Sequence, residues 1–283
     1  MDNKKITIIK PKTKWFDLRL KEVYKYKDLV YLFTKRNFSI LYKQTILGPL
    51  WLFLSPFITT VVFSLVFGGL AGLNGSGVPS MVFYMAGTIM WQLFSESVSK
   101  IGNTFNNNGH IFSKVYFPRL VIPIAQVFTE ISQFLIKFVM FLGFYIFYVL
   151  TEGIAPSGYI FLVPVLILQM SILGAGLGLI QTSLTTKYKD LTVFMAFILQ
   201  LWMYISPVAY AVSEFAGYNK FIQLVVNINP VTPIIEIFRY GFFGAGGVVN
   251  FLYWGISIAL TLVVLLVGIL LFNRTEKTFA DTI

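Results

Sequence analysis

The sequence contains no cysteine and a single histidine, His110, among its 283 residues. Without cysteine the chain can form neither a disulfide framework nor a thiolate site, and one histidine argues against a zinc or haem centre. We therefore expect no metal site and no cofactor in this chain.

Charged residues are also scarce. They make up 12% of the chain, compared with roughly 25% in soluble domains. Apolar residues are abundant instead, since 57% of the residues are hydrophobic and the mean hydropathy is +0.76. A single water-soluble core does not account for this excess, so the composition predicts a membrane protein.

Motifs that would supply chemistry are missing as well. No G-x-x-x-x-G-K-[ST] run occurs, so the chain has no P-loop for ATP. The "GAGLG" run at Gly174–Gly178 lies inside an apolar segment, where glycines four apart are typical of close helix packing. No Ser-His-Asp arrangement is available either. We predict a membrane subunit that is not itself an enzyme.

Six apolar runs are predicted to cross the bilayer as helices, because about 20 residues suffice for a span. They are Leu50–Ala71, Met81–Ile101, Leu120–Leu150, Tyr159–Thr182, Leu191–Val212 and Val248–Phe272. The fold class expected is an all-α membrane protein with six transmembrane helices. Its parts are a cytoplasmic N-terminal region (1–49), the transmembrane domain (50–272) and a cytoplasmic C-terminal tail (273–283).

Basic residues indicate the orientation. Residues 1–49 hold twelve Lys and Arg, and segments 102–119, 183–190 and 273–283 hold two each. The opposite loops hold only Lys220 and Arg239. By the positive-inside rule, both termini and the loop 102–119 are cytoplasmic.

The segment Lys21–Gln44 is typical of an amphipathic helix. An a/d spacing, broken only by Asn37, is followed by Val23, Tyr26, Val30, Phe33 and Ile40. Basic residues lie between them, namely Lys25, Lys27, Lys35, Arg36 and Lys43. Such a helix lies in the membrane interface with its apolar face down. The alternative is a basic helix that only fixes the topology.

The segment 213–247 is apolar but is interrupted by Asn229-Pro230 and by Pro233. Each half is too short to cross, which predicts a re-entrant helical hairpin on the outer face, between spans five and six. Glu236 and Arg239 are three residues apart on its second half, so they can pair.

Glu130 and Lys137 are seven residues apart in the third span and share one helix face. Charges at that depth usually face the protein interior or a water path. A proton relay is one interpretation of this pair, although no histidine or aspartate lies in the spans.

Five stretches resemble one transporter family. They are "LFTKRNFSILYKQTILGPLWLFLSP" (Leu32–Pro56), "IFSKVYFPRLVIP" after an asparagine-rich turn, "KYKDLTVFMAFILQLWMYISPVAY" (Lys187–Tyr210), "NINPVTPIIEIFRYGFF" and "EKTFADTI". They resemble the polysaccharide-exporting ABC transporter permeases of the type-2 exporter class, which includes O-antigen, capsule and wall teichoic acid exporters. The resemblance covers nearly the whole chain, and the motifs are in order.

The resemblance implies a homodimer in the bacterial cytoplasmic (inner) membrane, bound by a dimer of separate ABC ATPase subunits that carry the ATP and magnesium. It implies as cargo a polysaccharide linked to a polyprenyl diphosphate carrier, such as an O-antigen, capsular or teichoic acid polymer. Membrane lipid is a further expected partner, and nucleic acid is not. The repeat unit and charge of the glycan are not encoded in these motifs.

The resemblance also implies roles for particular residues. The loop 102–119 is the family's coupling loop to the ATPase, with candidate residues Asn107, Gly109, Ile111, Phe112, Lys114, Tyr116, Phe117 and Arg119. We expect the asparagines and Gly109 to break the preceding helix, and the aromatic side chains to anchor the ATPase.

The re-entrant segment 213–247 becomes the outer gate, with candidates Asn229, Pro230, Pro233, Glu236 and Arg239. Aromatic rings could stack on a passing glycan, and the candidates near span ends are Tyr84, Trp91, Phe94, Trp202 and Tyr204. The alternatives for these rings are an interfacial belt or packing. Basic residues that could attract the carrier's diphosphate are Lys35, Arg36 and Lys43, although topology alone would also place them there.

Three other functions stay open at this point. The same architecture could export a drug or a lipid. An ion- or proton-coupled transporter would use Glu130 and Lys137 as its relay. A membrane-embedded glycosyltransferase would need a cluster of acidic groups near an aqueous face, and the sequence shows none.

Overall fold

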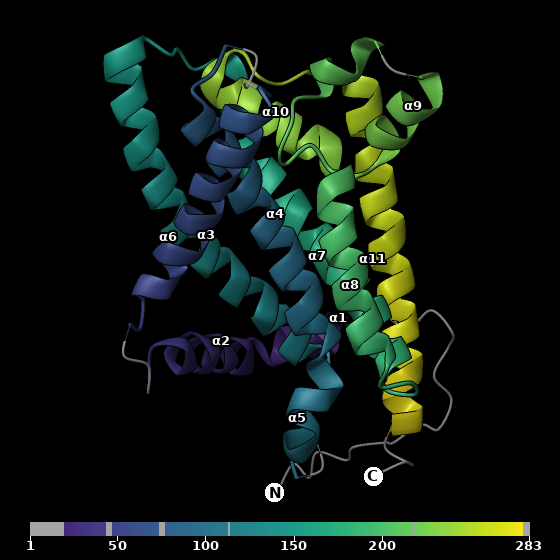
Figure 1. Ribbon diagram of the computed structural model, residues 1–283. Coiled ribbons are helices and arrows are strands. Elements are labelled where there is room, and N and C mark those ends of the chain that lie inside the picture. The colour runs from purple at the N-terminus through teal and green to yellow at the C-terminus, as the bar shows by residue number, and fades with distance from the viewer. Residues whose placement is uncertain (1–19, 44–46, 74–76, 113, 218, 280–283) are drawn as a thin grey trace, which may run out of the picture.

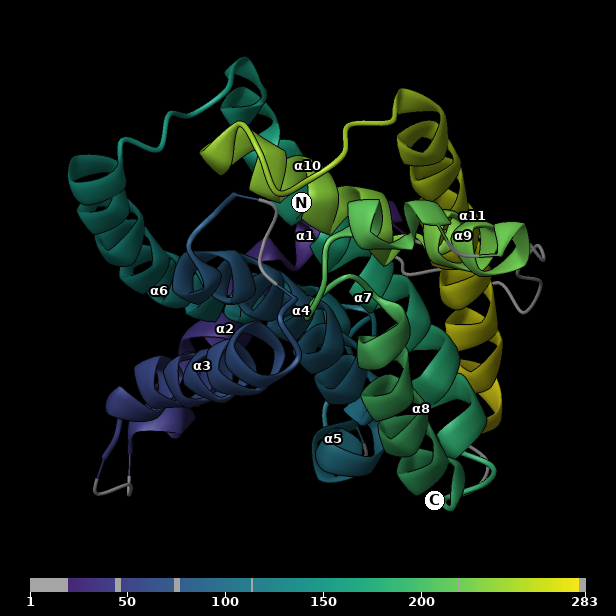
Figure 2. The ribbon, with the colours of Figure 1, turned by 45° about the horizontal axis from the view of Figure 1, so that its top comes forward.

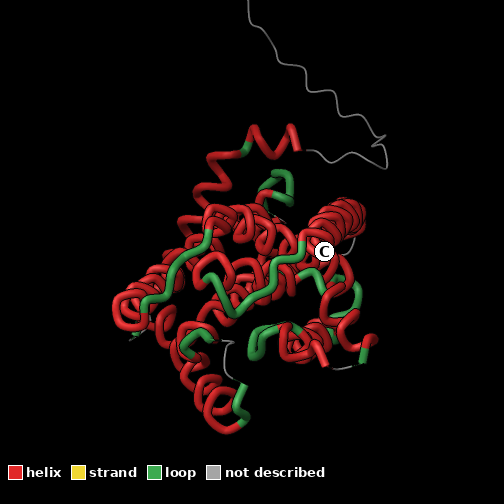
Figure 3. The backbone as a smooth tube through the Cα atoms, turned by 90° about the horizontal axis from the view of Figure 1, so that it is seen from above, coloured by secondary structure: helices red, strands yellow, loops and turns green. Residues whose placement is uncertain are grey.

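The computed structural model describes residues 20–43, 47–73, 77–112, 114–217 and 219–279. Within these ranges the chain consists of helices and loops, with no strand (Figure 1, Figure 3). The elements are α1 (Leu20–Lys25), α2 (Lys27–Tyr42), α3 (Leu50–Phe63), the π-helix η1 (Ser64–Leu70), α4 (Ser80–Gly102), α5 (Thr104–Phe112), α6 (Val121–Glu152), the 3₁₀ helix η2 (Gly158–Leu162), α7 (Val163–Thr185), α8 (Leu191–Ile205), the 3₁₀ helix η3 (Val212–Gly217), α9 (Lys220–Ile228), α10 (Val231–Phe243) and α11 (Phe251–Phe279).

Four helical segments of the described chain are long and apolar enough to cross a membrane. They are Leu50–Leu70, Val121–Glu152, Gly158–Thr185 and Phe251–Glu276. The pair α9 and α10 counts as a fifth candidate if the two helices are taken together. The expectation of an all-helical, multi-pass membrane protein is therefore confirmed, whereas the count of six spans stays a prediction.

The fifth predicted span is shorter than expected. Helix α8 ends at Ile205, because Ser206 adopts an extended conformation with ψ 146° and Pro207 follows it. Its 15 residues are about 22 Å long at 1.5 Å per residue, less than the roughly 30 Å of a hydrocarbon core. The predicted boundary at Val212 was wrong, and residues 206–211 form a turn.

Helix α4 lies at the centre of the bundle, packed against α3, α6 and α7 (Figure 1). A Cβ atom on Gly174 would lie 2.7 Å from Ser97 Cβ, and one on Gly178 would lie 2.7 Å from Ile101 Cβ. Both separations are too short for a side chain, so these two glycines are what lets α7 approach α4. The prediction of a glycine packing surface is confirmed.

The region before the first span forms two helices rather than one. Helix α1 ends at Lys25 and α2 begins at Lys27, and Gln44 lies outside the described residues. Helix α2 runs across the lower end of the bundle (Figure 1). Val30 and Phe33 are buried against it, while Lys35 is exposed. The apolar face of α2 therefore packs at least partly on protein.

The coupling loop contains a helix where a break was expected. Helix α5 runs through Asn106–Asn108 and Gly109, and the helix break falls at Asn103 instead. One of the three asparagines bonds one turn back within the helix: Asn108 Nδ2 donates to the Thr104 carbonyl at 3.0 Å. In Figure 1, α5 projects from the lower end of the bundle beyond α4.

Helices α9 and α10 meet at an angle of 81°. Asn229 and Pro230 form the bend, and both helices lie at the end of the molecule opposite α5 (Figure 1, Figure 2). The structure thus contains the broken apolar helix pair that the sequence predicts. Its depth in the bilayer stays a prediction.

Candidate functional site: the outer bend and the inner polar network

The bend between α9 and α10 is held by side-chain hydrogen bonds from two neighbouring helices. Asn229 Oδ1 accepts from the Trp202 indole at 3.1 Å and from the Val231 amide at 3.2 Å. Asn229 Nδ2 donates to Ser206 Oγ at 2.9 Å. On the other side, Ser257 Oγ of α11 donates to the Pro230 carbonyl at 2.6 Å. The predicted gate residues Asn229 and Pro230 are therefore structural anchors of the bend.

Arg239 is fully buried at the core of the same region. Its guanidinium lies 3.7 Å from the centroid of the Phe83 ring, which favours a cation–π contact. It donates to the backbone carbonyls of Pro207 (2.6 Å), Val208 (2.7 Å) and Tyr210 (3.0 Å). One side chain thus holds the whole turn that follows α8.

Glu236 contacts the loop that joins α10 to α11. Its Oε2 accepts from the Val248 amide at 2.9 Å, and its Oε1 lies 3.5 Å from Arg239 Nη1. The two charges do approach each other, as expected from their spacing, but the shorter contacts of both go to the backbone. Pro233 is buried in the same helix. The pair therefore joins residues 207–210 and residue 248 to α10.

Two ion pairs join α4 to α6. Lys100 Nζ lies 3.0 Å from Glu130 Oε1, and Lys137 Nζ lies 2.8 Å from Glu96 Oε1. Glu130 and Lys137 are almost completely buried, so each has its opposite charge on α4 rather than on its own helix. Both groups of the proposed proton relay are thus engaged in pairs.

A polar network continues from these pairs to the lower end. Glu130 Oε1 accepts from Gln126 Nε2 at 2.6 Å, and Gln126 Oε1 accepts from Asn37 Nδ2 at 3.0 Å. Arg36 donates to Asn37 Oδ1 and to Asn108 Oδ1, at 3.1 and 3.3 Å. The contacts run without interruption from α5 through α2 to α6 and α4.

The three basic residues proposed to attract the carrier's diphosphate have different environments. Lys35 and Lys43 are exposed at the end where α2 lies. Arg36 is half-buried, stacks on the Phe33 ring and forms the contacts just described. Burial lowers the pKa of Arg36 from its ordinary value. Lys35 and Lys43 are therefore the available cations of the three.

Aromatic rings tie the coupling loop to the bundle. Phe117 contacts Phe33 of α2 and Phe112 through tilted rings, at centroid distances of 5.7 and 5.8 Å. Phe112 meets Phe105, which lies 4.9 Å from Phe272 of α11. Phe117 is buried, contrary to the expectation that it faces a partner. These rings hold the loop in place because they fill space between α2, α5 and α11.

The side chains of the coupling loop that are exposed are not those of the packed rings. Tyr116 is 88% exposed, Asn107 and Lys114 are exposed, and Ile111 and Gly109 are half-buried. Arg119 is half-buried, donates to the Glu276 carbonyl at 2.7 Å, and has its pKa lowered by burial. Tyr116 is thus the aromatic residue that a partner could reach.

Most of the proposed channel aromatics are inside the bundle. Tyr84, Trp91 and Phe94 are buried because α4 is surrounded by other helices, and Trp202 is half-buried against Asn229. For the three rings on α4 this burial favours the packing alternative. Tyr204 alone of the five is exposed, at 54%.

Sequence reasoning missed the exposed face of α8. Val193, Phe194, Phe197, Leu201 and Tyr204 recur every three or four residues, and all are exposed. The 3.6-residue period was a usable signal, but in a segment that is apolar on all sides it does not stand out.

No group of three or more His, Cys, Asp or Glu side chains that could hold a metal ion occurs among the residues the structure describes.

Comparison with known proteins matches the chain to a transporter family. The ABC-2 type transporter profile matches residues 28–243, from α2 to the end of α10. Two O-antigen export system permease proteins RfbA of Klebsiella pneumoniae are 26% and 27% identical over 256 residues, covering 90% of this chain and 94% of each relative. The RfbA permease of Myxococcus xanthus is 26% identical over 225 residues, covering 79% of this chain and 84% of the relative. Since the profile spans well over half of its residues, the chain belongs to the ABC-2 type transporter family.

Proposed function

We propose that the chain is the transmembrane permease subunit of an ATP-driven ABC exporter that moves a lipid-linked polysaccharide across the bacterial cytoplasmic membrane. The similarity to three O-antigen export permeases over most of their length supports the cargo class. Coupling to the ATPase is supported by helix α5, which projects from the bundle. The helix projects beyond α4 at the end that the basic residues assign to the cytoplasm.

The working unit is a homodimer with both termini in the cytoplasm and six spans per subunit, bound by an ATPase dimer. α5 is suited to docking because its base is fixed and its tip is exposed. The rings of Phe112 and Phe117 fix the base, and Tyr116 follows the helix as an exposed aromatic. Exposed aromatics are frequent anchors of protein contacts.

A movement of α5 would be passed on through the polar network. Asn108 of α5 contacts Arg36 of α2, and Asn37 of α2 contacts Gln126 of α6. Gln126 in turn bonds Glu130, which pairs with Lys100 of α4. ATP-driven displacement of α5 would therefore pull on two membrane helices at once.

The exposed face of α8 is suited to the glycan path. Its rings, Phe194, Phe197 and Tyr204, offer apolar surfaces on which sugars stack without fixed hydrogen bonds, so a polymer can slide. Lys35 and Lys43 at the inner end would attract the diphosphate of a polyprenyl carrier.

The decisive experiment is a pull-down of the ATPase subunit with permease variants. Tyr116→Ala should reduce ATPase binding about 30-fold, the equivalent of roughly 2 kcal/mol for a lost aromatic anchor, with unchanged thermal stability. Tyr24→Ala is the matched control, since Tyr24 is 73% exposed on α1. If Tyr116→Ala binds the ATPase as the parent does and exports at the parental rate, the docking assignment is wrong.

The cargo is tested in cells that lack the permease. Lipid-linked glycan should accumulate at the cytoplasmic face and should return to the surface when the parental chain is supplied. Normal surface glycan in the deletion strain would contradict the polysaccharide cargo and favour export of a drug or another lipid. Transport that persists without the ATPase subunit would favour an ion-coupled carrier.

A further inference from the structure

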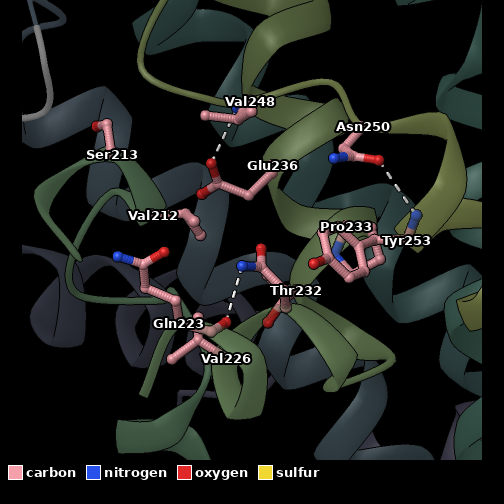
Figure 4. A pocket seen from close by; sticks show the side chains of 11 residues that line it. Val212, Ser213, Gln223, Val226, Thr232, Pro233, Glu236, Val248, Asn250 and Tyr253 are labelled. Carbon is pink, nitrogen blue, oxygen red and sulfur yellow. Dashed lines mark hydrogen bonds between the residues drawn. The ribbon is translucent and has the colours of Figure 1, made fainter. Parts of the chain in front are cut away.

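A cavity of about 260 Å³ lies between η3, α9, α10 and the start of α11 (Figure 4). Its polar lining comes from several successive elements, and the residues are Ser213, Gln223, Asn227, Thr232, Glu236, Asn250 and Tyr253. Asn250 is exposed, so the rim of the cavity reaches the surface at the end opposite α5. Two of the outer-gate candidates, Pro233 and Glu236, line it, but no ligand has been assigned to it above.

One buried polar atom of the cavity lining, Thr232 Oγ1, has no hydrogen-bond partner among the described residues, and its side chain is 3% exposed. One turn further along α10, Glu236 Oε1 makes an ion-pair contact of 3.5 Å with Arg239 Nη1. Buried polar groups in native proteins are nearly always hydrogen-bonded, to protein or to something bound. A polar guest in the cavity would supply the bond that the Thr232 hydroxyl lacks.

The charge of the site selects a neutral guest. Arg239 Nη1 lies 3.5 Å from Glu236 Oε1, so the carboxylate already has a compensating cation. A cation guest would find no second carboxylate in the lining, and an anion would meet the carboxylate itself. The lining also carries the amides of Asn227 and Asn250, which can both donate and accept. Asn227 Nδ2 donates to the Gln223 carbonyl and Asn250 Oδ1 accepts from the Leu252 amide, so each amide uses one of its two ends within the chain.

The size and shape of the cavity further restrict the class of ligand that fits it. The volume is just below the roughly 300–1,000 Å³ of pockets that enclose drug-sized ligands, which suits one six-membered ring rather than a chain. A carboxylate, several amides and the ring of Tyr253 in one cavity match the vicinal hydroxyls and the apolar face of a sugar. We propose that this cavity binds a single neutral pyranose unit of the glycan as it leaves the outer face, an inference that rests on the proposed cargo.

A sugar in this cavity would bridge the two halves of the bent helix pair. Asn227 belongs to α9, Thr232 and Glu236 belong to α10, and Tyr253 belongs to α11. The guest would therefore contact both sides of the Asn229–Pro230 bend and would favour the bend angle seen here.

The test is sugar binding to the full-length permease in lipid nanodiscs without the ATPase. Saturation-transfer NMR would be recorded with methyl α-glucopyranoside, methyl α-galactopyranoside and methyl α-mannopyranoside, and with 2-(hydroxymethyl)tetrahydropyran as a ring without vicinal hydroxyls. At least one pyranoside should bind in the millimolar range and the control ring should not. Asn227→Leu and Tyr253→Ala should each weaken binding at least about fivefold, which corresponds to roughly 1 kcal/mol. Tyr188→Ala, an exposed tyrosine outside the cavity, should leave it unchanged.

The outcomes separate this inference from the proposed function. If no pyranoside binds, or if Asn227→Leu and Tyr253→Ala bind like the parent, the sugar site is refuted even when polymer export depends on the permease. Displacement of the bound sugar by calcium at constant ionic strength would equally refute a neutral-sugar site. Sugar binding that is lost in both variants supports the site even if the ATPase pull-down fails.

Discussion

The indole N–H of Trp202 donates to Asn229 Oδ1 across 3.1 Å and thereby ties the end of α8 to the bend between α9 and α10. The same asparagine accepts a hydrogen bond from the Val231 amide at the start of α10 and donates to Ser206. One side chain of the bend therefore positions two helices and the turn between them.

Replacing Asn229 should destabilise the permease more than replacing a nearby asparagine. Asn229→Ala leaves the Trp202 indole and the Val231 amide unsatisfied, and each buried unpaired group costs about 1–3 kcal/mol. Asn227→Ala removes a bond to the Gln223 carbonyl of its own helix and should cost less. Thermal unfolding of the purified variants measures the difference. Equal melting temperatures for the two variants would mean that the bend does not depend on this asparagine.

Reversing the charges of Glu236 and Arg239 together should not rescue a single reversal. Arg239 holds three backbone carbonyls, and a carboxylate at position 239 would repel them. The same logic makes Arg239→Lys costly, because an ammonium lacks the planar fork of donors that reaches several carbonyls. We expect the double reversal to unfold at a lower temperature than Glu236→Gln. A double variant as stable as the parent would show that the direct ion pair dominates.

The two ion pairs between α4 and α6 should respond unequally to neutralisation. Glu96→Gln removes the only ion-pair partner of Lys137 among the described residues, although the amide oxygen can still accept a hydrogen bond. Lys100→Gln leaves Glu130 with the amides of Gln126 and Gln133. An uncompensated buried charge costs about 3–5 kcal/mol, reduced here because Glu96 is 31% exposed. Glu96→Gln should be the less stable variant in thermal unfolding, and the reverse order would contradict this assignment of partners.

Gly178 and Gly143 provide a matched pair of helix glycines. Alanine at position 178 would press against Ile101 and separate α4 from α7, whereas no atom lies within 4 Å of a Cβ at position 143. Gly178→Ala should lower the melting temperature and the yield of folded protein. Gly143→Ala should be neutral or stabilising by up to about 1 kcal/mol, since alanine favours helix. A tolerated Gly178→Ala would show that the two helices can move apart without cost.

Cysteine labelling tests the six-span topology, and the absence of native cysteine removes any background. Cysteine at Glu152, an exposed residue at the end of α6, should react with an impermeant thiol reagent added to spheroplasts. Cysteine at Asn107, exposed on α5, should react only after the membrane is opened. Labelling of position 107 from outside would mean that the assigned orientation or the number of spans is wrong.

Features that depend on local pattern were readable from the chain alone. The apolar runs, the bias of lysine and arginine, the Asn229-Pro230 break and the glycine spacing of α7 each follow from helix geometry or transfer free energy along a short stretch. They led to an all-helical membrane protein, a broken helix pair and a close contact at Gly174 and Gly178, which the structure contains.

Tertiary packing decided which side of each helix is buried against other helices. Nothing near Tyr84, Trp91 or Phe94 in the sequence distinguishes a ring that faces a channel from one enclosed by α3, α6 and α7, because an apolar ring suits lipid and core equally well. The same ambiguity hid the inward position of Phe117. Contacts between residues far apart in sequence, such as Arg239 with the turn after α8 and Lys100 with Glu130, form only when the helices pack together. Local sequence thus specifies the apolar helices and the break at Asn229-Pro230, while the partners of the few buried polar groups are set by the arrangement of the helices around α4.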